Sequence, residues 1–115
     1  MRHQTKLFSE PFYRIKEKKK IIEVRLFDEK RQKISIGDEI EFSLTNDLDK
    51  KILVKVIGLS KFKTFKDLYS RFHYSLFGHP HGTTLNDQLK DIMECYSKEE
   101  EEKYKVFGIH IELIE

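Results

Sequence analysis

The sequence predicts an α+β fold, a small and partly closed mixed β-barrel of about five or six strands with two or three inserted helices. The chain has 115 residues, the length of one domain with a modest core, so we expect a single domain over residues 1–115. Aromatic residues make up 12% of it, more than a disordered chain carries. Strand-like segments follow one another without helices regularly between them, which disfavours a doubly wound parallel sheet.

The first predicted element is a short helix over residues 11–18. Pro11 suits the first turn of a helix, where its missing N–H leaves no hydrogen bond unmade. Phe8, Phe12 and Ile15 recur at a spacing of four and then three residues, which predicts one apolar stripe along this helix.

A strand is predicted over residues 21–27, because the segment is rich in β-branched side chains. Successive side chains of a strand point to opposite faces of the sheet. The aliphatic residues at 22, 24 and 26 therefore share one face, and Glu23 and Arg25 point together to the other.

The later elements follow from alternating apolar residues in strands and from helical spacing in helices. In chain order we expect a turn at 36–38, a strand over 39–43, a loop over 45–50, a strand over 51–60, a helix over 64–76, a loop over 77–84, a helix over 85–96, a short helix opened by Ser97, and a strand over 106–114. Thr64 and Thr84 are residue types that cap helix N-termini, and the glutamates after Ser97 suit the positive end of a helix.

Charge is unevenly distributed along the chain, although the net charge is only +2. Residues 1–33 contain eleven Lys and Arg against five Asp and Glu, a balance of +6, and residues 34–115 contain eleven against fifteen, a balance of −4. A basic third beside an acidic remainder suggests a polarised surface with one face suited to anions.

The cysteine content and the hydropathy of the chain limit the cellular compartments in which we expect the protein. The single cysteine, Cys95, excludes an intramolecular disulfide and a four-cysteine zinc site, and beside an apolar helix stripe it is interpreted as structural. No apolar run approaches the roughly 18 residues that a membrane span requires. The N-terminal residues are not followed by the apolar region of a secretory signal, so we expect a cytoplasmic protein with no membrane partner.

The most informative segment is Lys20-x-x-Glu23-x-Arg25, at the predicted junction of helix and strand. It brings an ammonium, a carboxylate and a guanidinium close together at the rim of a barrel. Such a cluster can bind phosphate through Lys and Arg, and packing can also lower the pKa of a lysine and make it reactive. An ordinary surface ion pair is the other interpretation that the spacing allows.

This segment resembles the core of the Gly-x-Lys-x-x-Glu-x-Arg signature of ASCH domains, which belong to the PUA-like superfamily. The likeness to small bacterial members continues over nearly the whole chain, at residues 10–16, 28–31, 36–42, 96–104 and 108–109. The resemblance implies a PUA-like pseudo-barrel with a cleft beside the motif, and it implies RNA or a nucleotide or nucleoside as partner.

On this resemblance, the nucleic-acid-binding residues would be phosphate-binding cations, a carboxylate that accepts hydrogen bonds from a base, and a histidine of the 77–84 loop. The phosphate-binding cations would be Lys19, Lys20, Arg25, Lys30 and Arg31, the carboxylate would be Glu23, and the histidine would be His81.

The alternative that the resemblance raises is a small hydrolase, because one group of small bacterial members deacetylates N4-acetylcytidine with a Lys-Thr-Glu set. Lys20 matches that lysine and would be the base or nucleophile, with Glu23 as its partner where the group has threonine. The segment matching the group's catalytic glutamate contains His79 and His81 and no carboxylate. A protein-interaction module, the third possibility, would require an exposed apolar patch that the sequence does not indicate.

Two further features complete the expectations. The glycine of the signature is Lys18 here, so we expect the helix to end without its usual left-handed cap. The pair His79 and His81 lacks a third ligand at a short spacing, and no glycine-rich phosphate loop or nucleotide fingerprint occurs, so we expect neither a metal nor a cofactor.

Overall fold

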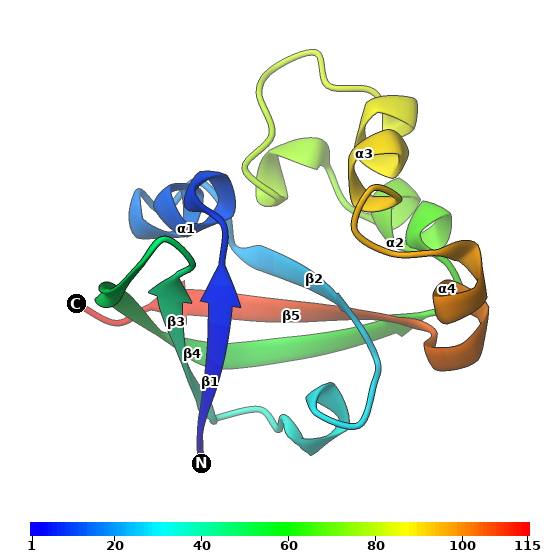
Figure 1. The fold of residues 1–115 in the computed structure, drawn as a ribbon. Helices are drawn as coiled ribbons and strands as arrows, with labels where there is room; N and C mark the ends of the chain where they lie inside the picture. The colour runs from blue at the N-terminus through cyan, green and yellow to red at the C-terminus, as the bar shows by residue number, and fades with distance from the viewer.

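The computed structural model describes residues 1–115 as one five-stranded mixed sheet with helices around it (Figure 1). The strand order is β1-β3-β4-β5-β2; β1 and β3 are parallel, and the other neighbours are antiparallel. The strands are β1 (Arg2–Leu7), β2 (Ile22–Leu26), β3 (Glu39–Leu44), β4 (Asp47–Phe62) and β5 (Val106–Leu113). The sheet curls into a half-barrel, so the predicted α+β class and mixed barrel are confirmed.

Four α-helices surround the sheet, at the four helical segments predicted along the chain, although the predicted architecture has two or three inserted helices; 3-10 turns lie at Arg31–Lys33 and Tyr74–Leu76. The helices are α1 (Ser9–Lys16), α2 (Phe65–Arg71), α3 (Leu85–Ile92) and α4 (Lys98–Tyr104). Figure 1 shows α1 on one side and α2 and α3 on the other, with β2 running between them. Residues from both groups line one pocket.

The core consists of two hydrophobic clusters. One includes Phe12 and Ile15 of α1 with the inner face of the curled sheet, and the other includes Phe65 and Leu68 of α2 with one face of β2. The aliphatic residues 22, 24 and 26 all belong to the second cluster, as their alternation predicts. Glu23 is therefore directed away from that cluster.

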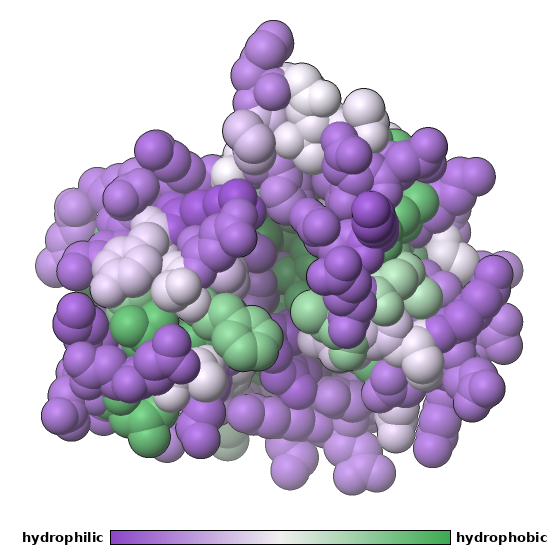
Figure 2. All heavy atoms as spheres, turned by 45° about the horizontal axis from the view of Figure 1, so that its top comes forward, coloured by the Kyte–Doolittle hydropathy of each residue, from purple (hydrophilic) through white to green (hydrophobic).

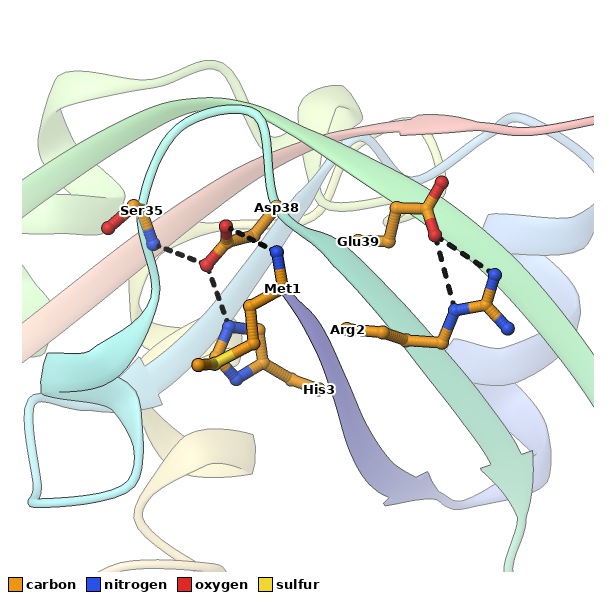
Figure 3. Close-up of polar contacts among 6 residues, drawn as sticks. All are labelled: Met1, Arg2, His3, Ser35, Asp38 and Glu39. Carbon is orange, nitrogen blue, oxygen red and sulfur yellow. Dashed lines mark hydrogen bonds and ion pairs between the residues drawn. The ribbon is translucent and has the colours of Figure 1, made fainter.

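Strand β1 is absent from the sequence-based prediction, because its residues are mostly polar and show no apolar alternation. Polar contacts to the 35–39 segment hold it beside β3 instead (Figure 3). His3 Nε2 lies 2.8 Å from Asp38 Oδ2, and Arg2 donates to Glu39 Oε1. The hydrogen bond from His3, together with the backbone N–H of Ser35, lowers the pKa of Asp38 to about 2.

Several element boundaries differ from the prediction. Most of the predicted loop at 45–50 belongs to β4, a long strand that lies between β3 and β5 and pairs with both. The predicted helix over 64–76 ends at Arg71, because the side chain of His73 accepts from Ser75 N and caps a separate 3-10 turn. The predicted helix over 85–96 ends at Ile92, shortly before Ser97 caps the next helix.

The turn after α1 keeps a left-handed conformation even though lysine stands in place of the family's glycine, which corrects the expectation of a missing cap. Lys18 has φ = 64°. Its N–H donates to Ile15 O (2.9 Å), and Lys19 N–H donates to Arg14 O (2.8 Å), which are the two hydrogen bonds of a Schellman motif. The backbone geometry is thus retained with a side chain that disfavours it.

The acidic run within α4 is also more than a solvated helix start. Glu101 is 8% exposed, and its Oε2 accepts a 2.7 Å hydrogen bond from the backbone N–H of Phe65 in the first turn of α2. Glu101 therefore satisfies a buried donor that α2 cannot satisfy within itself.

We predict that Lys18→Gly raises the free energy of unfolding by about 1 kcal/mol, because glycine adopts positive φ without the steric cost that lysine bears. Urea denaturation measures the change. The matched control is Lys16→Gly, at a helical position of α1, which is expected to lower stability by about 1 kcal/mol. Equal destabilisation by both glycines would contradict the strained turn.

Glu101→Ala is expected to lower the free energy of unfolding by about 2 kcal/mol, because it leaves the Phe65 N–H buried without an acceptor. The control is Glu102→Ala, an exposed neighbour on α4, expected to stay within about 0.5 kcal/mol of the wild type. Thermal or urea unfolding of the two variants compares them directly, and indistinguishable stabilities would argue against the cap.

Candidate functional site

The candidate site is centred on the carboxylate of Glu23, which lies between two cations. Lys20 Nζ is 3.0 Å from Glu23 Oε1, and Arg25 donates to Glu23 Oε2 from Nε (3.0 Å) and lies 2.9 Å away through Nη2. The three motif residues converge, as the sequence predicts. Their side chains are 13%, 5% and 18% exposed for Lys20, Glu23 and Arg25, so this is not an ordinary surface ion pair.

Local structure positions each member. Glu23 and Arg25 are alternate residues of β2 and share a face. Lys20 follows the left-handed turn after α1, where its backbone forms a bridge with Phe77 that fixes its direction. The turn, the bridge and the strand together set the geometry of the cluster.

Burial and charge act in opposite directions on Glu23. Burial raises the pKa of its carboxyl, but the charges of Lys20 and Arg25, with their hydrogen bonds, outweigh burial and hold the pKa at about 2. Glu23 is therefore ionised at neutral pH. It has free acceptor capacity, because a carboxylate offers about four lone-pair positions.

Arg25 has a second role at the seam of the half-barrel, defined as the gap between the edge strands β1 and β2. Its Nη2 donates to the backbone carbonyl of Lys6 on β1 (3.3 Å). Because β1 and β2 are at opposite ends of the strand order, this contact bridges the open side of the sheet.

Glu23 lies in a pocket of about 410 Å³, here called the Glu23 pocket, where the two core clusters separate. Its walls come from the end of β1, the start of α1, β2, α2 and the segment after α3. Apart from the motif residues, the lining includes Lys6, Leu7, Phe8, Pro11, Val24, Thr45, Tyr69, Ile92, Cys95 and Tyr96. Figure 2 shows this face hollowed, with hydrophobic residues at the floor and hydrophilic residues crowding around.

The sequence does not predict the aromatic rim of the pocket, Phe8 and Tyr96. Phe8 is not part of the buried helix stripe, because α1 starts at Ser9 and Phe8 has extended backbone before it; its exposed fraction is 68%. Tyr96 is half-buried in the opposite wall. The only sequence signal that Phe8 is exposed at a pocket would have been its position, as an aromatic residue immediately before a helix of a basic protein.

Cys95 is exposed and lies in the pocket wall, rather than being the structural residue expected from the apolar stripe.

Burial raises the pKa of Tyr69, so its hydroxyl stays protonated and can donate a hydrogen bond. The pocket therefore combines one carboxylate, three cations and several rings.

The other predicted residues lie at different distances from this pocket. Lys30 and Arg31 line an adjoining groove on the β1 side. Lys19 lies in a separate depression with Arg14 and His79. His81 is exposed and contacts the hydroxyl of Tyr74 (3.2 Å). Binding by each of these residues stays a prediction.

No three His, Cys, Asp or Glu side chains are gathered as a metal site. None of the helices combines the length and the apolar character needed to cross a membrane.

A family model described as the ASCH domain matches residues 6–115. The chain belongs to the ASCH domain family. Its match starts within β1 and contains the whole Glu23 pocket. Among curated proteins, none matches this ASCH chain.

Solved structures resemble the chain over its full length. The crystal structure of the hypothetical protein PH0355 has 34% identity and a TM-score of 0.88, covering 99% of this chain and 100% of that one. The solution structure of protein PF0455 from Pyrococcus furiosus has 29% identity and a TM-score of 0.76, covering 100% and 99%. A mutant of ZmASCH from Zymomonas mobilis has 16% identity and a TM-score of 0.64, covering 96% and 67%, a likeness of fold alone.

We predict an acid-dependent loss of stability that Glu23 controls. The carboxyl has a pKa of about 2 in the folded protein against 4.5 ordinarily, so its contribution is complete above pH 4.5 and is lost as pH falls toward 2. Between pH 6 and pH 3 this amounts to about 2 kcal/mol. The measurement is urea denaturation of the wild type and Glu23→Gln at both pH values.

The variant should be less stable at neutral pH, because it leaves two cations without their shared anion, and the difference from the wild type should shrink at pH 3. Asp38, whose pKa is also about 2, is unchanged in both proteins and cancels in the comparison. A difference that does not depend on pH would show that Glu23 is not held ionised.

Proposed function

We propose that this ASCH protein binds RNA or a nucleotide by holding a nucleobase in the Glu23 pocket. The observation that carries the proposal is a buried carboxylate, ionised between two cations, with unused acceptor capacity at the floor of a ligand-sized hollow. The volume of about 410 Å³ falls in the range of small-molecule sites.

Glu23 favours a base that presents an amino group. Carboxylates accept hydrogen bonds from the exocyclic amine of cytosine in known nucleic-acid recognition, and a buried anion selects strongly for donors. Lys20 and Arg25 can donate at the same time to a base carbonyl or a phosphate.

The walls of the pocket suit the flat faces of a base. Phe8 and Tyr96 line opposite sides of it, and stacking on an aromatic side chain contributes about 1–3 kcal/mol per base. Unpaired bases are what RNA-binding proteins stack in this way.

The alternative hydrolase, with Lys20 and Glu23 as catalytic residues, has less support. A carboxylate with a pKa of about 2 is a weak general base at neutral pH. The ammonium of Lys20 forms an ion pair with that carboxylate, and no second carboxylate lines the pocket. A binding site accounts for these features without a reactive lysine.

Calorimetric titration with cytidine and uridine 5′-monophosphates tests the proposal. We expect the cytidine nucleotide to bind more tightly, and Phe8→Ala to weaken its binding by roughly fivefold to a hundredfold. The control is Ile36→Ala, since Ile36 is 66% exposed but lies outside the pocket.

The single cysteine gives an independent readout. Because Cys95 lies in the pocket wall, a bound nucleotide should slow its reaction with a thiol reagent in the wild type. Absence of binding and of protection for every nucleotide would remove the proposal. Release of acetate from N4-acetylcytidine by the wild type, but not by Lys20→Met, would replace it with the hydrolase.

A further inference from the structure

A second hollow of about 580 Å³, here called the basic groove, adjoins the Glu23 pocket. Lys6 of β1 and Arg25 of β2 line both hollows, so the two adjoin at the seam of the half-barrel. A ligand in the pocket can therefore extend past these two side chains into the groove.

The basic groove carries a strong excess of positive charge. Five cations line it against one carboxylate, Glu41, and only one lining residue is hydrophobic. The cations are Lys6, Arg25, Lys30, Arg31 and Lys51. Such a surface suits a row of anionic groups and offers little to an apolar ligand.

Two of the five cations have no carboxylate partner, whereas Arg25, Arg31 and Lys51 are paired with Glu23, Asp28 and Glu41. Neither Lys6 nor Lys30 forms an ion pair with a carboxylate, and the ammonium of Lys30 donates instead to the backbone carbonyl of Gln4 (2.7 Å). Burial, followed by the neighbouring charges of Arg31 and Arg25, lowers the pKa of Lys30. Like charges crowd here, and an anion would relieve their repulsion.

Backbone carbonyls hold two of the groove cations, Lys30 and Arg25, along the free edge of β1. Gln4 O accepts from Lys30 and Lys6 O accepts from Arg25, and carbonyls two residues apart in a strand point to the same side. A neutral carbonyl fixes the position of a cation without cancelling its charge. The charge of Lys30 thus remains available to an outside anion, whereas that of Arg25 is shared with Glu23.

We propose that the Glu23 pocket and the basic groove form one site for single-stranded RNA, with an unpaired base in the pocket and the neighbouring phosphates along the groove. The inference rests on the proposed function, because the base anchors the strand. Duplex RNA is disfavoured, since a paired base cannot enter the pocket and phosphates outside it would carry binding alone. The site then reads one base and tracks the backbone beside it.

The test compares a cytidine mononucleotide with a short single-stranded oligoribonucleotide containing cytidine, and with the corresponding duplex. The groove variant is Lys30→Gln with Lys51→Gln, whose residues line the groove but not the pocket. The matched control is Lys66→Gln with Lys98→Gln, two exposed lysines that line neither hollow and change net charge equally.

We expect the single strand to bind at least about tenfold more tightly than the mononucleotide at low salt, because several phosphates then contact cations. The groove variant should lose most of this gain and reduce the salt dependence of single-strand binding by about 1.4 in the log–log slope, while its mononucleotide affinity stays that of the wild type. The control variant should lose much less.

Other outcomes overturn the inference in distinguishable ways. Equal losses in the groove and control variants, or a duplex that binds as tightly as the single strand, would show that the groove is not a track for a strand. Direct binding of an oligoglutamate peptide that the groove variant loses, without any binding of the oligonucleotide, would assign the groove to acidic proteins. If the mononucleotide and the oligonucleotide both fail to bind, the proposed function itself is wrong. A DNA strand of the same sequence that binds equally well would overturn the restriction to RNA.

Discussion

The fold and the candidate site depend on one buried contact, the carboxylate of Glu23 between Lys20 and Arg25. Moving a carboxylate out of water costs several kcal/mol, and only close cations with good hydrogen bonds offset that cost. Here both conditions hold, and the pKa of Glu23 falls in spite of burial. Because Arg25 also reaches the Lys6 carbonyl, the same contact connects the two edge strands.

This arrangement is not what stability alone requires. Well-packed apolar residues often replace a buried ion pair with no loss of stability. The charged cluster instead keeps a preorganised acceptor and two donors at the floor of a hollow whose walls are aromatic and aliphatic. Groups already held in place lose little conformational entropy when a ligand arrives, which favours specific binding.

The sequence predicts the parts of the site that depend on local pattern. Alternation in β2 places Glu23 and Arg25 on one face, and the helix–strand junction places Lys20 beside them. It does not predict β1, whose polar residues are held by contacts to a segment more than thirty residues away, such as His3 with Asp38. Phe8 was misplaced because one residue at the start of α1 decides whether its ring is buried or exposed.

The seam between β1 and β2 connects these points. Open strand edges invite pairing with other chains, and proteins commonly protect them with charged side chains. Here Lys30 and Arg25 occupy carbonyls along the free edge of β1, which blocks a further strand from adding there. Lys30, held on neutral backbone with no carboxylate partner, also leaves the groove with uncompensated charge. The cations placed along this edge therefore both protect the edge and attract an anion. This explains why the basic groove follows the opening of the half-barrel instead of lying elsewhere on the surface.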